Sequence, residues 1–333
     1  MTILVTGASG LVGSRVCQCL ARDGVRVRGV VRSSVLEGAS CQHEVVGPID
    51  RATDWHHALL NVESVVHCAA RVHVMKDAST DPVAAFRTVN VDGTLNLARQ
   101  AAAAGVRRFV FISSVKVNGE STPPGIAFTE TDSPTPQDAY GQSKLEAEQG
   151  LRQIATDTGM EVVIIRPPLV YGPGVKANFA ALMHAVQRGW PMPLGAVHNQ
   201  RSLVALDNLV DFIVTCLTHP KAANQTFLVS DGQDQSTAEL VRGLAQAAGV
   251  AARLIPVPVW ALLAGATLFG KGDAMQRLCG NLQVDIAKSR TLLGWAPPIS
   301  VAQGLHRVVI GNGAPVLVPN IDEIMRSDEH PRQ

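Results

Sequence analysis

The sequence predicts an α/β fold, a doubly wound parallel sheet followed by a smaller C-terminal lobe. Two observations support this prediction. The chain opens with an aliphatic run at 3–5, and a glycine-rich turn and a helical pattern over 12–21 follow at once. Further on, near-continuous apolar runs alternate with helical stretches, as expected for strands that are covered by helices on both faces.

The glycine-rich turn is a candidate site for a dinucleotide, which makes the expected sheet a Rossmann fold. Gly7, Gly10 and Gly13 are spaced Gly-x-x-Gly-x-x-Gly between the first strand and the first helix. Without side chains there, the backbone can approach a pyrophosphate, whose charge lies at the free N–H groups of the helix N-terminus. The residues of this turn that we also expect to contact the cofactor are Ser9, Leu11 and Val12.

The remaining strands are expected where β-branched and aliphatic residues cluster, at 25–31, 45–46, 65–67, 109–112, 162–165 and 227–229, with long helices at 82–104 and 138–158. Beyond Arg166, frequent prolines and shorter segments indicate a second lobe over the carboxyl edge of the sheet, where such folds bind ligands. The expected division is a dinucleotide-binding domain over 1–168 completed by 203–232, a substrate-binding lobe over 169–202 and 233–310, and a peripheral tail over 311–333.

The composition argues against several classes of partner. The 333 residues carry a net charge of +1 without a Lys/Arg run, which gives no reason to expect nucleic acid or an anionic membrane. The six cysteines include no Cys-x-x-Cys pair, so we expect reduced structural thiols in a cytoplasmic protein and no metal site. The apolar run at 257–269 is shorter than the ~20 residues of a membrane helix, so we expect no membrane insertion. We expect a helix packed in the core or at an interface, with association with a membrane surface as the alternative.

The end of the second strand bears on the choice of cofactor. NAD-binding sheets usually place an acidic residue there, against the ribose 2′-hydroxyl. This chain has Arg32 followed by two serines, which suit a 2′-phosphate better. The sequence therefore favours NADP(H), with NAD(H) as the alternative, although Arg32 can also be an ordinary solvated residue.

A second group of residues suits proton transfer. Tyr140 and Lys144 are four residues apart at the start of a helix, so both side chains project from one face. An ammonium near a phenol lowers the pKa of the phenol and makes it a usable acid or base near neutral pH. Ser114 follows the strand at 109–112, and its hydroxyl can converge with the phenol on one substrate atom. Without a cofactor site upstream, the same Tyr–Lys spacing would also fit an ordinary surface pair.

Together these motifs resemble the extended short-chain dehydrogenases/reductases of the nucleotide-sugar epimerase/dehydratase family. The resemblance spans nearly the whole chain and rests on 7–13, Ala69-Ala70, 90–94, Ser113-Ser114, 140–144 and 166–174. It implies that Tyr140 is the acid/base, that Lys144 binds the nicotinamide ribose and lowers the pKa of Tyr140, and that Ser114 holds the substrate oxygen. The further cofactor contacts that it implies are Ile49, Ala69, Ala70, Asn90 and Pro167.

The resemblance also implies a substrate site and an assembly. Asn178, Arg201 and Arg277 match positions that hold the diphosphate and the nearby sugar of a UDP-linked substrate. A guanidinium such as that of Arg201 can bind phosphate oxygens bidentately, whereas Arg277 can equally be a solvated helix residue. Members of this family are often homodimers through the two long helices, here 82–104 and 138–158.

Within the family, the segments 201–208, 282–285 and 293–295 look most similar to those of the bacterial 4-keto reductases that make UDP-N-acetyl-quinovosamine or UDP-N-acetyl-fucosamine for surface polysaccharides. Leu169 replaces the Asn that is common in epimerases and dehydratases, and Val115-Lys116 replaces the acidic pair of dehydratases. The expected activity is therefore NAD(P)H-dependent reduction of the C4 ketone of a UDP-linked 2-acetamido-2,6-dideoxy-hexos-4-ulose, an amino sugar. The alternative is a nucleotide-sugar 4-epimerase with retained NAD. A non-catalytic dinucleotide sensor is a remote third interpretation, since such proteins tend to lose the Tyr or the Lys.

Overall fold

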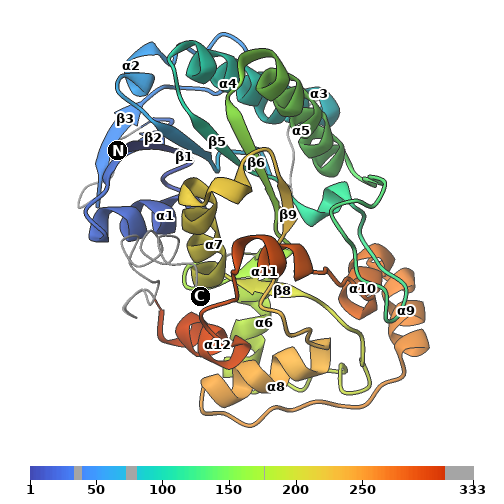
Figure 1. Cartoon of the computed structure of the whole chain (residues 1–333). Helices are drawn as coiled ribbons and strands as arrows, with labels where there is room; N and C mark the ends of the chain where they lie inside the picture. The colour runs from blue at the N-terminus through green and yellow to red at the C-terminus, as the bar shows by residue number, and fades with distance from the viewer. Residues whose placement is uncertain (34–39, 73–80, 176, 312–333) are drawn as a thin grey trace.

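The main element of the protein is a seven-stranded parallel sheet with the order β3-β2-β1-β4-β5-β6-β9 (Figure 1). The structure is a computed structural model that describes residues 1–33, 40–72, 81–175 and 177–311. The strands of this sheet are β1 (Thr2–Thr6), β2 (Arg26–Val31), β3 (Gln42–Val45), β4 (Ser64–His67), β5 (Arg108–Ile112), β6 (Glu161–Arg166) and β9 (Thr226–Leu228). The chain reverses its direction across the sheet between β1 and β4, the position at which doubly wound sheets bind ligands. The expected fold class is confirmed.

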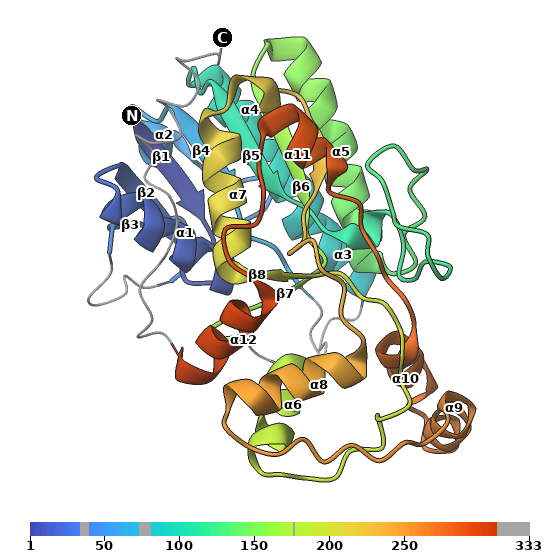
Figure 2. The ribbon, with the colours of Figure 1, turned by 60° about the horizontal axis from the view of Figure 1, so that its bottom comes forward.

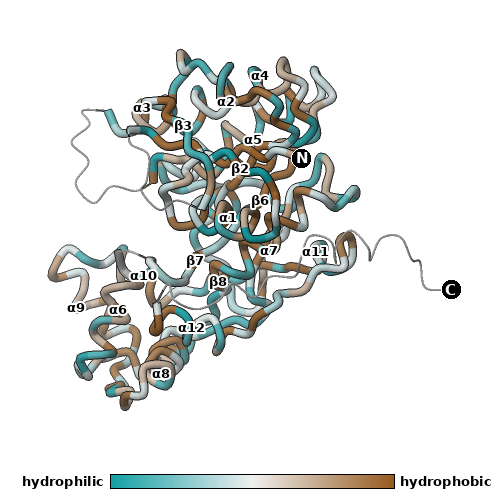
Figure 3. Tube along the Cα trace, turned by 90° about the vertical axis from the view of Figure 1, so that its left-hand side faces the viewer, coloured by the Kyte–Doolittle hydropathy of each residue, from teal (hydrophilic) through white to brown (hydrophobic). Residues whose placement is uncertain are grey.

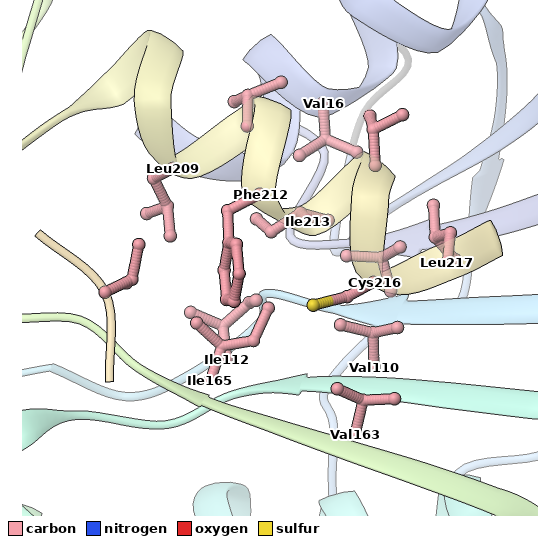
Figure 4. Close-up of a cluster of buried hydrophobic side chains, with 14 of the residues drawn as sticks. Val16, Val110, Ile112, Val163, Ile165, Leu209, Phe212, Ile213, Cys216 and Leu217 are labelled. Carbon is pink, nitrogen blue, oxygen red and sulfur yellow. The ribbon is translucent and has the colours of Figure 1, made fainter. Parts of the chain in front are cut away.

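One face of the sheet is covered by α1 (Leu11–Arg22) and α7 (Leu206–Thr218). Figure 4 shows apolar side chains of α7, among them Phe212 and Cys216, lying over Val110 of β5 and Val163 of β6. Almost every residue of α7 is buried, so this helix belongs to the interior of the protein. Because α7 packs with α1, β5 and β6 in one core, it joins the β5 and β6 side of the sheet to the helix that follows the glycine turn.

The other face is covered by α4 (Thr94–Ala103) and α5 (Ala139–Thr158), with the short helices α2 (His56–Leu59) and α3 (Pro82–Arg87) beside them. The helix expected over 82–104 is interrupted, because a π-helical turn, η1 (Thr88–Gly93), separates α3 from α4. Gly93 in this turn has no room for a side chain, since a Cβ atom would lie 2.7 Å from Cγ2 of Ile49. π-helical turns often occur at functional sites, and this one carries Asn90.

The start of α5 is determined by an N-cap. The Asp138 carboxylate accepts a hydrogen bond from the Gly141 N–H at 2.7 Å, which satisfies one of the donors that a helix N-terminus leaves unpaired. The helix ends at Gly159, whose left-handed φ of 76° favours glycine. The cap places Tyr140 in the first turn of the helix, at the carboxyl edge of the sheet.

The second lobe has its own core and lies below the sheet in Figure 2. It contains α6 (Ala177–Gln187), α8 (Thr237–Ala247) and α12 (Val301–Ile310). A small sheet of β7 (Leu169–Tyr171) and β8 (Leu203–Ala205) lies between this lobe and the main sheet, as the profile in Figure 3 shows. Of the expected segment 203–232, only β9 joins the main sheet. The remaining short elements are η2 (Val115–Val117), η3 (Pro220–Ala222) and α11 (Ala287–Leu293).

The apolar run at 257–269 forms α9 (Val259–Leu268), which is followed by α10 (Gly272–Cys279). Leu262 is the one buried residue of α9, so this helix does not pack in the core, while its expected place at an interface stays a prediction. None of the helices in the described part of the chain has both the length and the apolar character that crossing a membrane requires. Nearly all of the tail predicted at 311–333 lies outside the described residues.

Candidate active site

The turn after β1 is shaped for close approach of a ligand to the backbone. Gly7 has a φ of 67°, and a Cβ atom there would lie 2.9 Å from the Ala69 nitrogen. A Cβ atom on Gly13 would lie 2.2 Å from the carbonyl oxygen of Gly7, so this position also requires glycine. No side chain caps α1, and its first turn has no acidic residue. The cradle and the open helix N-terminus therefore fit a dinucleotide pyrophosphate.

A buried hydrogen-bonded chain holds the neighbouring strand end. Nδ1 of His67 lies 2.7 Å from the Thr6 hydroxyl and Nε2 lies 3.0 Å from the Thr94 hydroxyl. Thr6 also accepts the Ala69 N–H at 3.2 Å. Burial, with a smaller contribution from the Lys144 charge, lowers the pKa of His67 to about 3, so its ring is neutral. The imidazole therefore positions the backbone beside the glycine turn.

Asn90 supports the same region from the π-helical turn. It is 1% exposed, and its amide exchanges hydrogen bonds with the backbone of Arg71, at 2.8 Å to the N–H and 3.0 Å to the carbonyl oxygen. Its Nδ2 also donates to the Ser143 hydroxyl at 3.0 Å. The Asn90 side chain thus connects the loop after β4 to α5 and supports the residues that line the site.

Ser114, Tyr140 and Lys144 are brought together at the carboxyl ends of β5 and β6. The Ser114 hydroxyl lies beside the Tyr140 phenol and lowers its pKa. Nζ of Lys144 donates to the Ile112 carbonyl oxygen at 2.8 Å and lies 6.0 Å from the centroid of the Tyr140 ring. Lys144 is 2% exposed, and burial lowers its pKa to about 8. The three side chains form a compact site for proton transfer.

The pKa of Tyr140 differs from the sequence-based expectation. Burial, and next the charge of Asp138, raise it to about 12, although the Ser114 hydrogen bond lowers it. The Lys144 ammonium is directed at a backbone carbonyl and does not lower the pKa of the phenol as expected. In this state the phenol is a proton donor at neutral pH. To act as a base it needs further positive charge nearby.

A buried carboxylate that the sequence analysis missed holds this site together. Glu148, one turn after Lys144, is 0% exposed and accepts hydrogen bonds from Ser113 Oγ at 2.6 Å and from Arg166 Nη2 at 2.6 Å. Arg166 also donates to the Asn118 side chain at 3.0 Å. This network joins α5 to the ends of β5 and β6. The signal in the sequence was an acid four residues beyond Lys144 and an arginine at the end of an apolar strand.

Beside the phenol lies a second ionic group that the sequence did not suggest. Nζ of Lys116 is 2.5 Å from Oδ2 of Asp138 and 2.8 Å from Oε1 of Glu120. Arg277 approaches the same Glu120 carboxylate at 3.8 Å. Lys116 therefore compensates the carboxylate that raises the pKa of Tyr140.

Two of the predicted substrate residues are neighbours. Nη1 of Arg201 donates to the carbonyl oxygens of Arg277 at 2.5 Å and Gly280 at 3.1 Å. The Arg277 side chain is 54% exposed. The third residue, Asn178, belongs to α6, and its side chain lies outside the described part of the structure.

The other predicted cofactor residues have different surroundings. Ile49 is 6% exposed and packs against Gly93, and the Pro167 carbonyl accepts the Val115 N–H at 3.0 Å. Arg32 is exposed at the end of β2, directly before residues 34–39, which lie outside the described residues. Within the described residues, no three or more His, Cys, Asp or Glu side chains are grouped as a metal site would need.

Comparison with known proteins identifies the family. A profile of the NAD dependent epimerase/dehydratase family matches residues 3–230. The chain belongs to this family. It is 51% identical over 308 residues to the UDP-glucose 4-epimerase of Vibrio cholerae, covering 92% of this chain and 94% of that protein. It is 30% identical to the UDP-glucose 4-epimerase of Mycolicibacterium smegmatis, covering 93% and 97%.

Solved structures agree with this placement. The UDP-glucose 4-epimerase of Thermotoga maritima, solved with UDP-glucose, is 25% identical and has a TM-score of 0.73 over 99% of this chain and 100% of that one. A UDP-glucuronic acid 4-epimerase from Bacillus cereus, solved with NAD, shares the fold with a TM-score of 0.74 at 22% identity over 98% and 99%.

These findings correct the expected activity. The prediction of a 4-keto reductase is wrong, and the alternative of a 4-epimerase is better supported. The preference for NADP(H) has no support either, because the family is described as NAD dependent. Leu169 was given too much weight, since its side chain is 49% exposed at the start of β7.

Proposed function

We propose that this protein is a UDP-sugar 4-epimerase that retains NAD. The observation that carries the proposal is the group of Ser114, Tyr140 and Lys144 at the edge of the glycine turn, in a chain 51% identical to a UDP-glucose 4-epimerase. The glycine cradle would hold the dinucleotide, which would supply reversible hydride transfer at C4 of the sugar. The positive charge of the oxidised nicotinamide would be the further charge that Tyr140 needs in order to ionise.

The residues of the chain would then handle the proton and the substrate. Tyr140 removes the proton of the C4 hydroxyl as the ketone forms and gives it back when the ketone is reduced from its other face. Ser114 donates a hydrogen bond to the same oxygen while it carries negative charge. Lys144, whose ammonium lies 6.0 Å from the centroid of the Tyr140 ring, would bind the nicotinamide ribose.

The substrate would be held by its diphosphate, near Arg201 and Arg277 on the second lobe. Arg201 is fixed by two backbone carbonyls, so its remaining N–H groups have a defined direction. A sugar tethered through its diphosphate can turn over within the site and present either face of C4. The choice of sugar, its use in surface polysaccharides and the homodimer remain predictions.

The test is to incubate the purified protein with UDP-glucose, UDP-galactose and their N-acetyl forms, without added cofactor, and to identify the products by NMR. We expect interconversion at C4 with no net change in absorbance at the nicotinamide band, and NAD in the supernatant after denaturation. Absence of interconversion of every sugar by protein that contains NAD would contradict the proposal.

A further inference from the structure

The helix α9 has an apolar side turned to solvent. Trp260 is 74% exposed, Leu268 is 85% exposed and Phe269, which follows the helix, is 81% exposed. Successive helical residues turn by about 100°, so Trp260, Ala264, Thr267 and Leu268 share one stripe about 100° wide. All four are exposed, whereas Leu262 on the opposite side is buried.

An ordinary surface helix turns its polar face to water, whereas α9 turns apolar residues to water. Its one polar side chain, Thr267, donates its hydroxyl to the Leu263 carbonyl oxygen at 2.8 Å, so that donor is satisfied within the helix. In Figures 1 and 2, α9 stands at the outer edge of the second lobe, with α10 between it and the rest of the chain. The stripe is therefore accessible to a large partner.

The charges around the stripe favour an anionic partner. Between 250 and 280 the chain has three basic residues, Arg253, Lys271 and Arg277, and a single acid, Asp273. Lys271 is exposed and follows directly after the apolar stripe. Arg277 lies 3.8 Å from the Glu120 carboxylate, so its charge is partly compensated, and Lys271 is the cation directly beside the stripe.

The size of the patch argues against a second copy of the chain. Aromatic side chains offer ~150–250 Å² each, so Trp260 and Phe269, with the smaller Leu268 beside them, together present roughly 500 Å². A stable protein interface buries ~800 Å² on each partner. Large apolar side chains with a nearby lysine are residue types that lie in the headgroup region of a bilayer.

We propose that α9 docks the protein on the surface of an anionic lipid bilayer, with the side chains of Trp260, Leu268 and Phe269 inserted among the lipid headgroups and Lys271 paired with lipid phosphates. None of the helices among the described residues would cross the bilayer. Because α10 carries Arg277, docking would hold the proposed diphosphate site close to the membrane surface.

The proposal is tested by sedimentation of the full chain with phosphatidylcholine vesicles that contain or lack phosphatidylglycerol. We expect binding to the anionic vesicles, and at least a roughly tenfold weaker binding when Trp260, Leu268 and Phe269 are all changed to Ser. Lys271→Glu, a single change at an exposed position, should also weaken binding. Leu60→Ser, at a 45% exposed leucine beside α2, is the matched control and should bind as the wild type does.

A fluorescence measurement keeps the test independent of folding in the triple variant. Addition of anionic vesicles should shift the emission of the wild type to the blue, and Trp260→Phe should bind while losing this shift. Failure of the wild type to bind anionic vesicles, or equal binding of the triple variant, would overturn the proposal. The proposal would also be overturned if the wild type bound no vesicles and the triple variant differed from it in molar mass by light scattering. The stripe would then be an interface between copies of the chain.

Discussion

Asp211 in α7 offers a stability prediction that can be worked out from its surroundings. The side chain is 3% exposed; its Oδ2 accepts the indole N–H of Trp295 at 2.6 Å, and its Oδ1 has no partner among the described residues. Burial raises the pKa of this carboxyl from 3.8 to about 6, although the Trp295 hydrogen bond lowers it. We therefore expect Asp211→Asn to stabilise the protein at neutral pH, because Asn keeps an acceptor for the indole and cannot ionise.

The direction of the pH dependence follows from the number of protons that the folded and the unfolded states bind. Below about pH 4 the carboxyl is protonated in both the folded and the unfolded state. Between about pH 4 and about pH 6 the unfolded chain releases the proton while the folded protein keeps it, so the free energy of unfolding falls as the pH rises. A difference of about 2 pKa units corresponds to ~3 kcal/mol. A buried amide without a partner costs ~1–3 kcal/mol, so the net gain at neutral pH should be about 1 kcal/mol.

The assay is urea unfolding of wild type and Asp211→Asn across this pH range, at matched NAD content, because bound ligand also stabilises the folded state. The advantage of the variant should grow by ~3 kcal/mol between the acidic and the neutral end. Asp157→Asn, at an exposed position on α5, is the control and should show no such trend. A difference between Asp211→Asn and wild type that is the same at every pH would refute the reasoning.

Four further predictions concern the site. Tyr140→Phe should lower kcat for C4 interconversion by ~10²–10⁴-fold while NAD is still retained, and an unchanged rate would exclude the proton-transfer role. Lys116→Met removes the ammonium that lies 2.5 Å from Asp138, so the Asp138 charge should raise the pKa of Tyr140 further and the rise of rate with pH should move to higher pH. An unmoved profile would show that Lys116 does not influence Tyr140. The Gly13→Ala protein should lose NAD during purification, because a Cβ atom would lie 2.2 Å from the Gly7 carbonyl oxygen. The NAD content is measured by absorbance after denaturation, and a normal content would refute the close approach of the backbone to the dinucleotide. Glu148→Gln should cost ~3–5 kcal/mol in urea unfolding because it leaves a buried guanidinium without its counter-charge, whereas a cost below ~1 kcal/mol would contradict this role.

Much of the proposed site could be found from local spacing. The glycine turn and Tyr140-x-x-x-Lys144 depend on residues close in sequence, and helix and turn geometry alone places them on one face or at one backbone bend. Glu148 could not be recognised in the same way, because its role depends on Arg166 and Ser113, which lie on two other elements. The adjacency of Arg201 and Arg277 likewise depends on the packing of α10 against the chain before β8.

By itself, the sequence determined the fold class, the glycine turn and the Tyr–Lys pair, since each is encoded in short-range patterns of residue type. Only the tertiary structure decided the electrostatics of the pair. Burial and the Asp138 charge raise the pKa of Tyr140, while Lys144 is directed at the Ile112 carbonyl. It also decided that α9 is exposed, because an apolar helix can pack in a core or lie at a surface, and only its neighbours in space distinguish the two. The pKa of a group depends on its burial and on nearby charges, to which residues from distant parts of the chain contribute. Short patterns in the sequence do not contain this information.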